Sequence, residues 1–134
     1  MKNISNRIYP SITGETDEDW KCKLEEVEDL NIKEIPLFLE KFTLSQREKI
    51  YKALESTPIE SIPLVHIRHD MSNDELRMLV DKYKAKYLTI HEVGFNYIDE
   101  WKGFEDKLFL EMSTDDIVAE NVKVEDIGGF CVDL

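Results

Sequence analysis

The chain has few cysteines and no long apolar segment. Its two cysteines, Cys22 and Cys131, lack the CxxC spacing of a zinc site and the density of a disulfide-rich secreted scaffold. We therefore expect two reduced thiols in a cytoplasmic protein. No run of about 18 apolar residues is present, which excludes a membrane span. The first seven residues contain no apolar core of a signal peptide.

Glycine motifs and positive charge are also scarce. The five glycines form neither GxGxxG nor GxxxxGK[ST], so a nucleotide-phosphate loop is not indicated. The nucleophile elbow GxSxG is absent as well. Lysine and arginine total 17 against 29 acidic residues, which gives a net charge of −12. A surface this acidic repels phosphate backbones and argues against nucleic acid as a partner.

What remains is the composition of one soluble globular domain. The 134 residues are 42% hydrophobic and 34% charged, which is enough apolar material for a real core. No stretch is rich enough in Pro, Gly or Ser to serve as a linker. We therefore treat residues 1–134 as a single domain.

Strand-like and helix-like segments alternate along the chain. Helix starts are indicated by Thr16 with Asp19, by the capping box from Ser45 to Glu48, and by a second box from Ser72 to Glu75. A fourth helix is predicted around residues 97–104, and a fifth from Ser113 or Thr114 to about residue 126. The predicted strands are residues 7–12, 34–40, 62–68, 87–91, 108–112 and 129–134.

This alternation predicts an α/β fold with a parallel sheet and right-handed crossovers. We expect a TIM-barrel-type (β/α) repeat of six parallel strands and five helices, which is an incomplete barrel. A doubly wound sheet is the alternative, and its ligands would gather at one switch point.

Five of the predicted strands end in a polar residue suited to binding a metal or a substrate. The carboxyl ends of the strands ring the active site of a parallel barrel, so such endings suggest a site. Their separations of 26, 25, 20 and 22 residues behave as a structural period. The five residues are Glu40, His66, His91, Glu111 and Asp133.

Residues two apart share one face of a strand, so each polar ending has predictable neighbours. Thr89 lies with His91, Phe109 with Glu111, and Cys131 with Asp133. The alternate residues are mostly bulky and apolar, and we expect them to pack under helices. The polar endings would then face a barrel interior. His69 and Asp70 are interpreted as loop residues that lead into the Ser72 cap.

The segments Leu-Val-His66, Thr-Ile-His91, Leu-Phe-Leu-Glu111 and Phe-Cys-Val-Asp133 resemble the xylose isomerase-like TIM barrels. That superfamily includes sugar and sugar-phosphate isomerases and epimerases and the endonuclease IV-type enzymes. The resemblance implies that Glu111 and Asp133 bind a divalent metal (Mn, Mg, Zn or Co). It also implies that His66 and His91 line the substrate pocket, and we place Glu40 with them as substrate-binding.

The function implied by this resemblance is a metal-dependent sugar or sugar-phosphate isomerase or epimerase. Metal polarisation of a sugar carbonyl would let Glu111 move a proton through an enediolate. The family's barrel has eight strands, and the His and Glu ligands of its last two strands have no counterpart here. We therefore expect a truncated chain that is inactive alone, completed by a further C-terminal segment or by association with itself.

Two alternatives remain open at this stage. An endonuclease IV-like phosphodiesterase uses a metal cluster on the same scaffold, although the net charge of −12 counts against it. In the second alternative, the chain is a non-catalytic, degenerate barrel that acts as a binding or assembly module through its unpaired edge strands.

Overall fold

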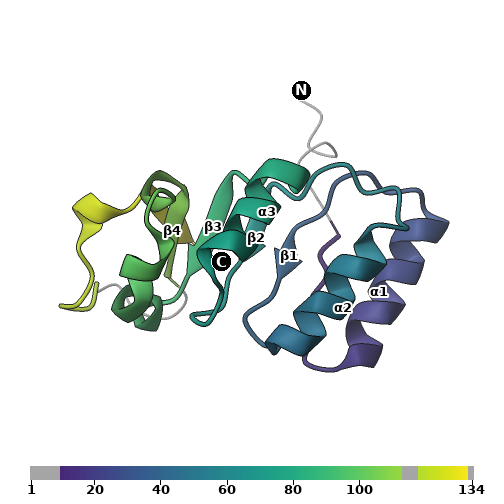
Figure 1. The fold of residues 1–134 in the computed structure, drawn as a ribbon, viewed down its shortest axis with the longest axis horizontal. Coiled ribbons are helices and arrows are strands. Elements are labelled where there is room, and N and C mark those ends of the chain that lie inside the picture. Colours follow the sequence, from purple (N-terminus) through teal and green to yellow (C-terminus); the bar gives the residue numbers. More distant parts are fainter. Residues whose placement is uncertain (1–9, 113–117, 133–134) are drawn as a thin grey trace.

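The computed structural model describes residues 10–112 and 118–132. These residues form an α/β fold around one parallel sheet of five strands in the order β1-β2-β3-β4-β5 (Figure 1). The strands are β1 (Leu37–Phe38), β2 (Leu64–His66), β3 (Tyr87–Ile90), β4 (Leu108–Met112) and β5 (Gly129–Val132). Each strand pairs only with its neighbours in sequence, so the order never reverses within the described sheet.

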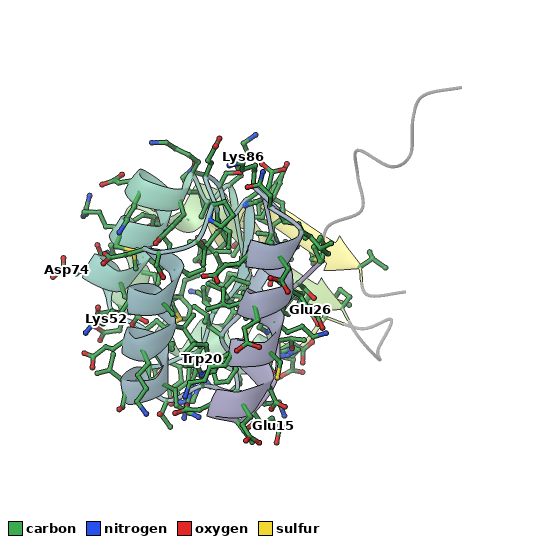
Figure 2. All side chains as sticks on the ribbon, turned by 90° about the vertical axis from the view of Figure 1, so that its right-hand side faces the viewer. Glu15, Trp20, Glu26, Lys52, Asp74 and Lys86 are labelled. Atoms are coloured by element: carbon green, nitrogen blue, oxygen red, sulfur yellow. The ribbon has the colours of Figure 1, made fainter. Side chains whose placement is uncertain are left out.

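The helix α1 (Asp17–Asp29) precedes β1, α2 (Leu44–Leu54) connects β1 to β2, and α3 (Asn73–Tyr83) connects β2 to β3. The later connections contain the 3₁₀ helices η2 (Glu92–Trp101), η3 (Glu105–Lys107) and η4 (Val124–Asp126). Right-handed crossovers in a sheet of sequential order place the helices on the same face. Figure 2 shows α1, α2 and α3 together on one side, with charged side chains such as Lys52 and Asp74 projecting outward.

The helix-covered face of the sheet is the core. Its strand residues are fully or almost fully buried, and Trp20, Leu24 and Val27 of α1 join the same apolar cluster. The paired registers align these residues in rows across the sheet. The strand residues on this face are Leu37, Val65, Leu88, Ile90, Leu108 and Leu110. Among the described residues no helix has the length and apolar character needed to cross a bilayer.

The opposite face carries the predicted polar set. His66 pairs in register with Thr89, and Thr89 pairs with Phe109 in turn. Glu111 pairs with Cys131 one step further along β4 and β5. The prediction that Thr89, Phe109, Glu111 and Cys131 point away from the aliphatic set is therefore confirmed. This face, opposite the helices, is more open, and Tyr87 on it is 46% exposed.

The predicted element count differs from the observed one. Of the predicted first strand, residues 7–9 lie outside the described residues, and Ile12 makes a single parallel bridge to Leu37. The described residues therefore form five strands where six were predicted for the whole chain. Residues 113–117 of the predicted fifth helix also lie outside the described part of the chain. Residues 118–123 are not helical, and only η4 follows.

Two predicted strands are shorter than expected because of proline. β1 begins directly after Pro36 and β2 directly after Pro63. Proline has no N–H to donate to the ladder, so it limits where regular pairing can start. The helix predicted around residues 97–104 is present as the 3₁₀ helix η2, which begins earlier, at Glu92, and ends at Trp101. Val93, Gly94 and Asn96 are weak helix formers, which disfavours a regular α-helix there.

The helix caps are partly as predicted. Thr16 and Asp19 form a complete capping box, and Ser72 accepts the backbone N–H of Glu75. The predicted box at Ser45 is wrong, because Thr43 caps α2 with Gln46 as its partner. Both segments have the pattern of a capping box, and α2 starts at the earlier one.

Candidate metal and substrate site

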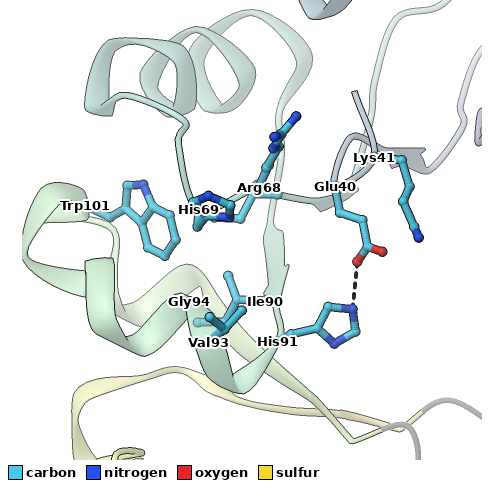
Figure 3. A pocket seen from close by; sticks show the side chains of 10 residues that line it. Glu40, Lys41, Arg68, His69, Ile90, His91, Val93, Gly94 and Trp101 are labelled. Carbon is cyan, nitrogen blue, oxygen red and sulfur yellow. Dashed lines mark hydrogen bonds and ion pairs between the residues drawn. The ribbon is translucent and has the colours of Figure 1, made fainter. Parts of the chain in front are cut away.

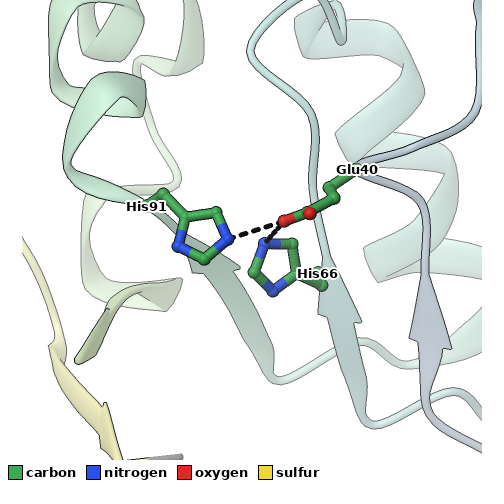
Figure 4. A group of neighbouring side chains, drawn as sticks. All are labelled: Glu40, His66 and His91. Carbon is green, nitrogen blue, oxygen red and sulfur yellow. Dashed lines mark hydrogen bonds and ion pairs between the residues drawn. The ribbon is translucent and has the colours of Figure 1, made fainter. Parts of the chain in front are cut away.

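The carboxyl ends of β1 to β4 bring four ionisable side chains together on the open face. β2 ends on His66, β4 carries Glu111, and Glu40 and His91 lie just beyond β1 and β3. Parallel strands place their carboxyl ends at one edge of a sheet, which is why residues so far apart in sequence meet. Figure 4 shows the side chains of Glu40, His66 and His91 converging from three successive strand ends.

One carboxylate oxygen of Glu40 lies close to both imidazoles. Its Oε2 atom lies 2.6 Å from Nε2 of His91, in a hydrogen bond. The same oxygen lies 2.7 Å from Nε2 of His66. The two imidazole rings are 4.7 Å apart between centroids and tilted by 54°. Nitrogen, nitrogen and oxygen thus meet around one point, and all three atoms lie within 4.8 Å of one another, so this group could hold a metal ion.

The other ring nitrogen of His66, Nδ1, also makes two close contacts. The Nδ1 atom is hydrogen-bonded to the hydroxyl of Thr89 at 3.1 Å, and Oε2 of Glu111 lies 2.6 Å from the same nitrogen. His66 is only 2% exposed, whereas the side chain of Glu111 is 13% exposed. Glu111 is therefore part of the cluster through His66, on the side away from Glu40.

The predicted site residues are thus largely adjacent. Glu40, His66 and His91 form one contact group, and Glu111 joins it. Asp133 lies outside the described residues, so the structure does not place it with Glu111. His69 is an exposed loop residue, as expected, and its ring lies tilted against that of Tyr97 with 5.0 Å between the ring centroids.

A pocket of about 200 Å³ opens beside the cluster (Figure 3). Glu40 and His91 form part of its wall, and Trp101 closes it at depth with no exposed surface. The indole Nε1 of Trp101 donates to the carbonyl of Met71 at 2.8 Å, which fixes the ring. The remaining lining residues are Lys41, Ile67, Arg68, His69, Ile90, Val93 and Gly94.

Arg47 supports the loops that carry the site and was missed in the sequence. It is fully buried on α2 and pairs with Glu75 of α3 through two contacts, at 2.7 and 3.2 Å. Its Nη1 group also donates to the carbonyl of Phe42 at 2.8 Å and to Asp70 at 3.1 Å. Phe42 and Asp70 lie in the loops after β1 and β2. Arg47 therefore ties together the loops that follow the two strands nearest Glu40 and His66.

The pKa values of Arg47 and Tyr51 determine the charge of the network around Arg47. Burial lowers the pKa of Arg47, but the hydrogen bond and charge of Glu75 outweigh it and leave that pKa above its ordinary value. Tyr51 donates its hydroxyl to Glu75 at 2.6 Å. Burial, and then the negative charge of Glu75, raise the pKa of Tyr51 well above its usual range. Arg47 thus remains a cation and Tyr51 a neutral donor at physiological pH.

Comparison with known proteins does not identify a family for this chain. No family model, curated protein or solved structure matches the chain.

A sequence signal for Arg47 does exist. Residues 47, 50 and 54 share one face of α2, and Ile50 and Leu54 are the apolar members of that face. A charged residue at a core position of an amphipathic helix requires a buried partner. The pattern does not say which acidic residue provides it, because Glu75 is 28 positions away.

Proposed function

We propose that this chain provides the metal-binding edge of a divalent-metal-dependent sugar or sugar-phosphate isomerase or epimerase. The scaffold would be an incomplete barrel of the xylose isomerase-like type. The observation that carries the proposal is the meeting of Glu40, His66, His91 and Glu111 from four successive strand ends. Catalytic groups drawn from several neighbouring strands are typical of barrel enzymes.

The strand order supports a barrel rather than a doubly wound sheet. A doubly wound sheet reverses its strand order at a switch point, where the ligand binds. The described sheet runs from β1 to β5 without a reversal, and its polar endings are spread over four strands. This is the arrangement that a barrel wall would have.

The chemistry of the cluster suits proton transfer next to a carbonyl group. A divalent cation bound here would polarise a substrate carbonyl and its neighbouring hydroxyl. We propose that Glu111 takes the proton from the adjacent carbon and that the imidazoles of His66 and His91 orient the substrate oxygens. The resemblance assigns Glu111 and Asp133 as metal ligands, and this assignment stays a prediction.

The pocket supports a small, anionic, polar substrate. Its volume of about 200 Å³ is suited to a compact molecule. Lys41 and Arg68 line it, and their other ion pairs are long, at 3.5 Å to Glu15 and 3.6 Å to Asp70. Arginine and lysine are the side chains that bind phosphate. A sugar phosphate is therefore the preferred substrate class within the proposal.

One observation favours a second candidate, a non-catalytic assembly module. β5 exposes Phe130 and Val132, which are 46% and 66% exposed. Exposed apolar side chains on an edge strand invite pairing with another chain. The endonuclease IV-like alternative has no such support, and salt-sensitive binding to abasic DNA would be needed to revive it.

Solvent-exchange NMR tests the proposed activity. The chain is incubated in D₂O with Mn²⁺, Mg²⁺, Zn²⁺ or Co²⁺ and with aldoses, ketoses and their phosphates. The expected inactivity of the chain alone concerns complete turnover, because the partner that would return the proton is missing. Reversible deprotonation by Glu111 would still exchange hydrogen with solvent, so we expect deuterium to enter the carbon next to the carbonyl of at least one substrate in the presence of metal. Glu111→Ala should lower the exchange rate by at least about 10²-fold, as expected for a lost proton-transfer group.

The matched control is Glu48→Gln, because Glu48 is an exposed carboxylate on α2. It should exchange at the wild-type rate. Retention of more than about a tenth of the wild-type rate in Glu111→Ala would contradict the assigned role. Absence of exchange with every metal and substrate would favour the assembly module.

A further inference from the structure

Nε2 of His66 is a buried nitrogen that needs a hydrogen-bond partner or a bound cation. The atom is buried and has no hydrogen-bond partner within residues 10–112 and 118–132, although Oε2 of Glu40 is only 2.7 Å away. The contact therefore lacks the geometry of a hydrogen bond. A buried polar atom without a partner is unfavourable, and such atoms in folded proteins require a specific explanation.

The other side of the ring indicates where the imidazole proton lies. Nδ1 faces Oε2 of Glu111 at 2.6 Å, and an ionised carboxylate accepts hydrogen bonds but cannot donate them. A proton on Nδ1 satisfies this contact and leaves a lone pair on Nε2. That lone pair then faces the oxygen of Glu40, so two electron-rich atoms lie 2.7 Å apart. Such a contact needs positive charge between or beside the two atoms.

The geometry points to a zinc-class divalent cation held by Glu40, His66 and His91. Two imidazoles and one carboxylate are a typical ligand set of catalytic zinc, which leaves a fourth position for water or substrate. This position differs from the Glu111 and Asp133 site that the resemblance implies. It also makes His66 and His91 metal ligands in place of the substrate contacts proposed above. The inference concerns binding alone, and its test is separate from that of the proposed isomerase activity.

Only a small adjustment would open the triad for a metal. Zinc bonds of about 2.0–2.1 Å in a tetrahedral site require ligand atoms about 3.3 Å apart. The present distances from Glu40 to the two histidines are 2.6 and 2.7 Å. Glu40 follows β1 in a loop, and its side chain is 30% exposed, so it can withdraw by rotation. The buried His66 ring can remain in place.

Glu111 then has a distinct role beside the metal. A histidine that binds a metal usually donates its other ring N–H to a carboxylate or carbonyl, which fixes its tautomer and orientation. Glu111 and Thr89 occupy that position at Nδ1 of His66. Glu111 is therefore a positioning residue for this cation and not one of its ligands.

Co²⁺ absorption spectroscopy with Zn²⁺ competition tests the ligand set. We expect one Co²⁺ per chain with the visible bands of a four-coordinate site, displaced by Zn²⁺. Glu40→Gln, His91→Ala and His66→Asn should each weaken binding beyond the roughly 10–100-fold that outer-shell partners contribute. The asparagine preserves a polar group near Nδ1 and removes Nε2, and circular dichroism checks that each variant is folded.

The matched controls separate ligands from bystanders. His69→Ala removes an exposed histidine and Glu48→Gln an exposed carboxylate, and both should bind as the wild type does. Glu111→Gln should keep the positions of the Co²⁺ bands and lose about 10–100-fold in affinity. Loss of the four-coordinate bands in Glu111→Gln, together with their retention in Glu40→Gln, would overturn the ligand assignment.

A second outcome would also overturn the inference. In that outcome the wild-type chain binds neither Co²⁺ nor Zn²⁺ with a Kd below about 100 μM, which corresponds to about 5.5 kcal/mol. That result would mean that a proton, and not a metal ion, lies between Glu40 and the two histidines. Metal binding without any deuterium exchange would leave this inference intact and contradict only the proposed isomerase activity.

Discussion

Glu40 and His91 are joined by a 2.6 Å hydrogen bond although 51 positions separate them in the sequence. The bond links the loop after β1 with the end of β3, across β2 and its terminal His66. It depends on the parallel register of three strands, each of which places its last polar residue at the same edge. The geometry of the site is therefore a direct consequence of the sheet topology.

Removing one member of the buried Arg47 pair should destabilise the fold strongly. Arg47→Ala leaves the carboxylate of Glu75, whose side chain is 9% exposed, without its cation. Breaking a buried pair in this way costs about 3–5 kcal/mol. The measurement is the free energy of unfolding in a urea titration followed by circular dichroism.

The double variant Arg47→Met with Glu75→Leu is the matched control for that prediction. It removes both charges and fills the space with apolar side chains, so it should recover most of the lost stability. Equal instability of the single and double variants would show that packing at Arg47, and not its charge, matters.

Tyr51 should make the fold sensitive to alkaline pH. Burial and the charge of Glu75 raise the pKa of Tyr51 in the folded state above the unfolded value of about 10. A group with a raised pKa contributes its stability fully below the unfolded pKa and loses it as pH rises beyond that value. Stability should therefore fall above about pH 10, and Tyr51→Phe should flatten this fall in urea titrations at pH 8 to 11.

The phenylalanine variant should also lose about 1 kcal/mol at pH 7, because Glu75 loses the 2.6 Å hydrogen bond from Tyr51. Tyr97→Phe is the control, since Tyr97 is 40% exposed. An alkaline fall of the same steepness in Tyr51→Phe and wild type would assign that fall to other groups.

The chain should associate with itself through β5. Phe130 and Val132 are exposed there, and β5 pairs only with β4 among the described strands. Pairing of two β5 edges would satisfy backbone groups and cover apolar side chains by a symmetric contact. Light scattering after size-exclusion chromatography, over a dilution series, should show a mass that rises with concentration.

Val132→Lys should shift that equilibrium toward the monomer, because a charged lysine blocks edge pairing. Val124→Lys is the control, since Val124 is 49% exposed on η4 and lies outside the sheet. A wild-type chain that stays monomeric at tens of micromolar would contradict the prediction. A dissociation constant in that range corresponds to about 6 kcal/mol of association free energy.

Local signals in the sequence predicted the site better than the element boundaries. Alternation of side chains placed His91 with Thr89 and Glu111 with Phe109, because the two-residue period of a strand depends only on the backbone. Thr16 and Asp19 likewise form the predicted cap. These features are local, so a single sequence contains enough information for them.

Features that depend on tertiary contacts were beyond prediction. Nothing in the segment around His66 indicates that its two ring nitrogens face different carboxylates, Glu40 and Glu111. That arrangement follows from the register of β1 to β4 and from the lengths of two side chains. The partnership of Arg47 with Glu75 is of the same kind, since it requires the packing of α2 against α3.

The presence of a cation on Glu40, His66 and His91 can be observed by diffraction at the zinc absorption edge, from crystals of the chain grown with Zn²⁺. We expect one anomalous peak about 2 Å from Oε2 of Glu40 and from Nε2 of His66 and His91. The same crystals would show Nδ1 of His66 still facing Glu111. A peak on Glu111 that makes no contact with Glu40, or the absence of any peak at the triad, would contradict it.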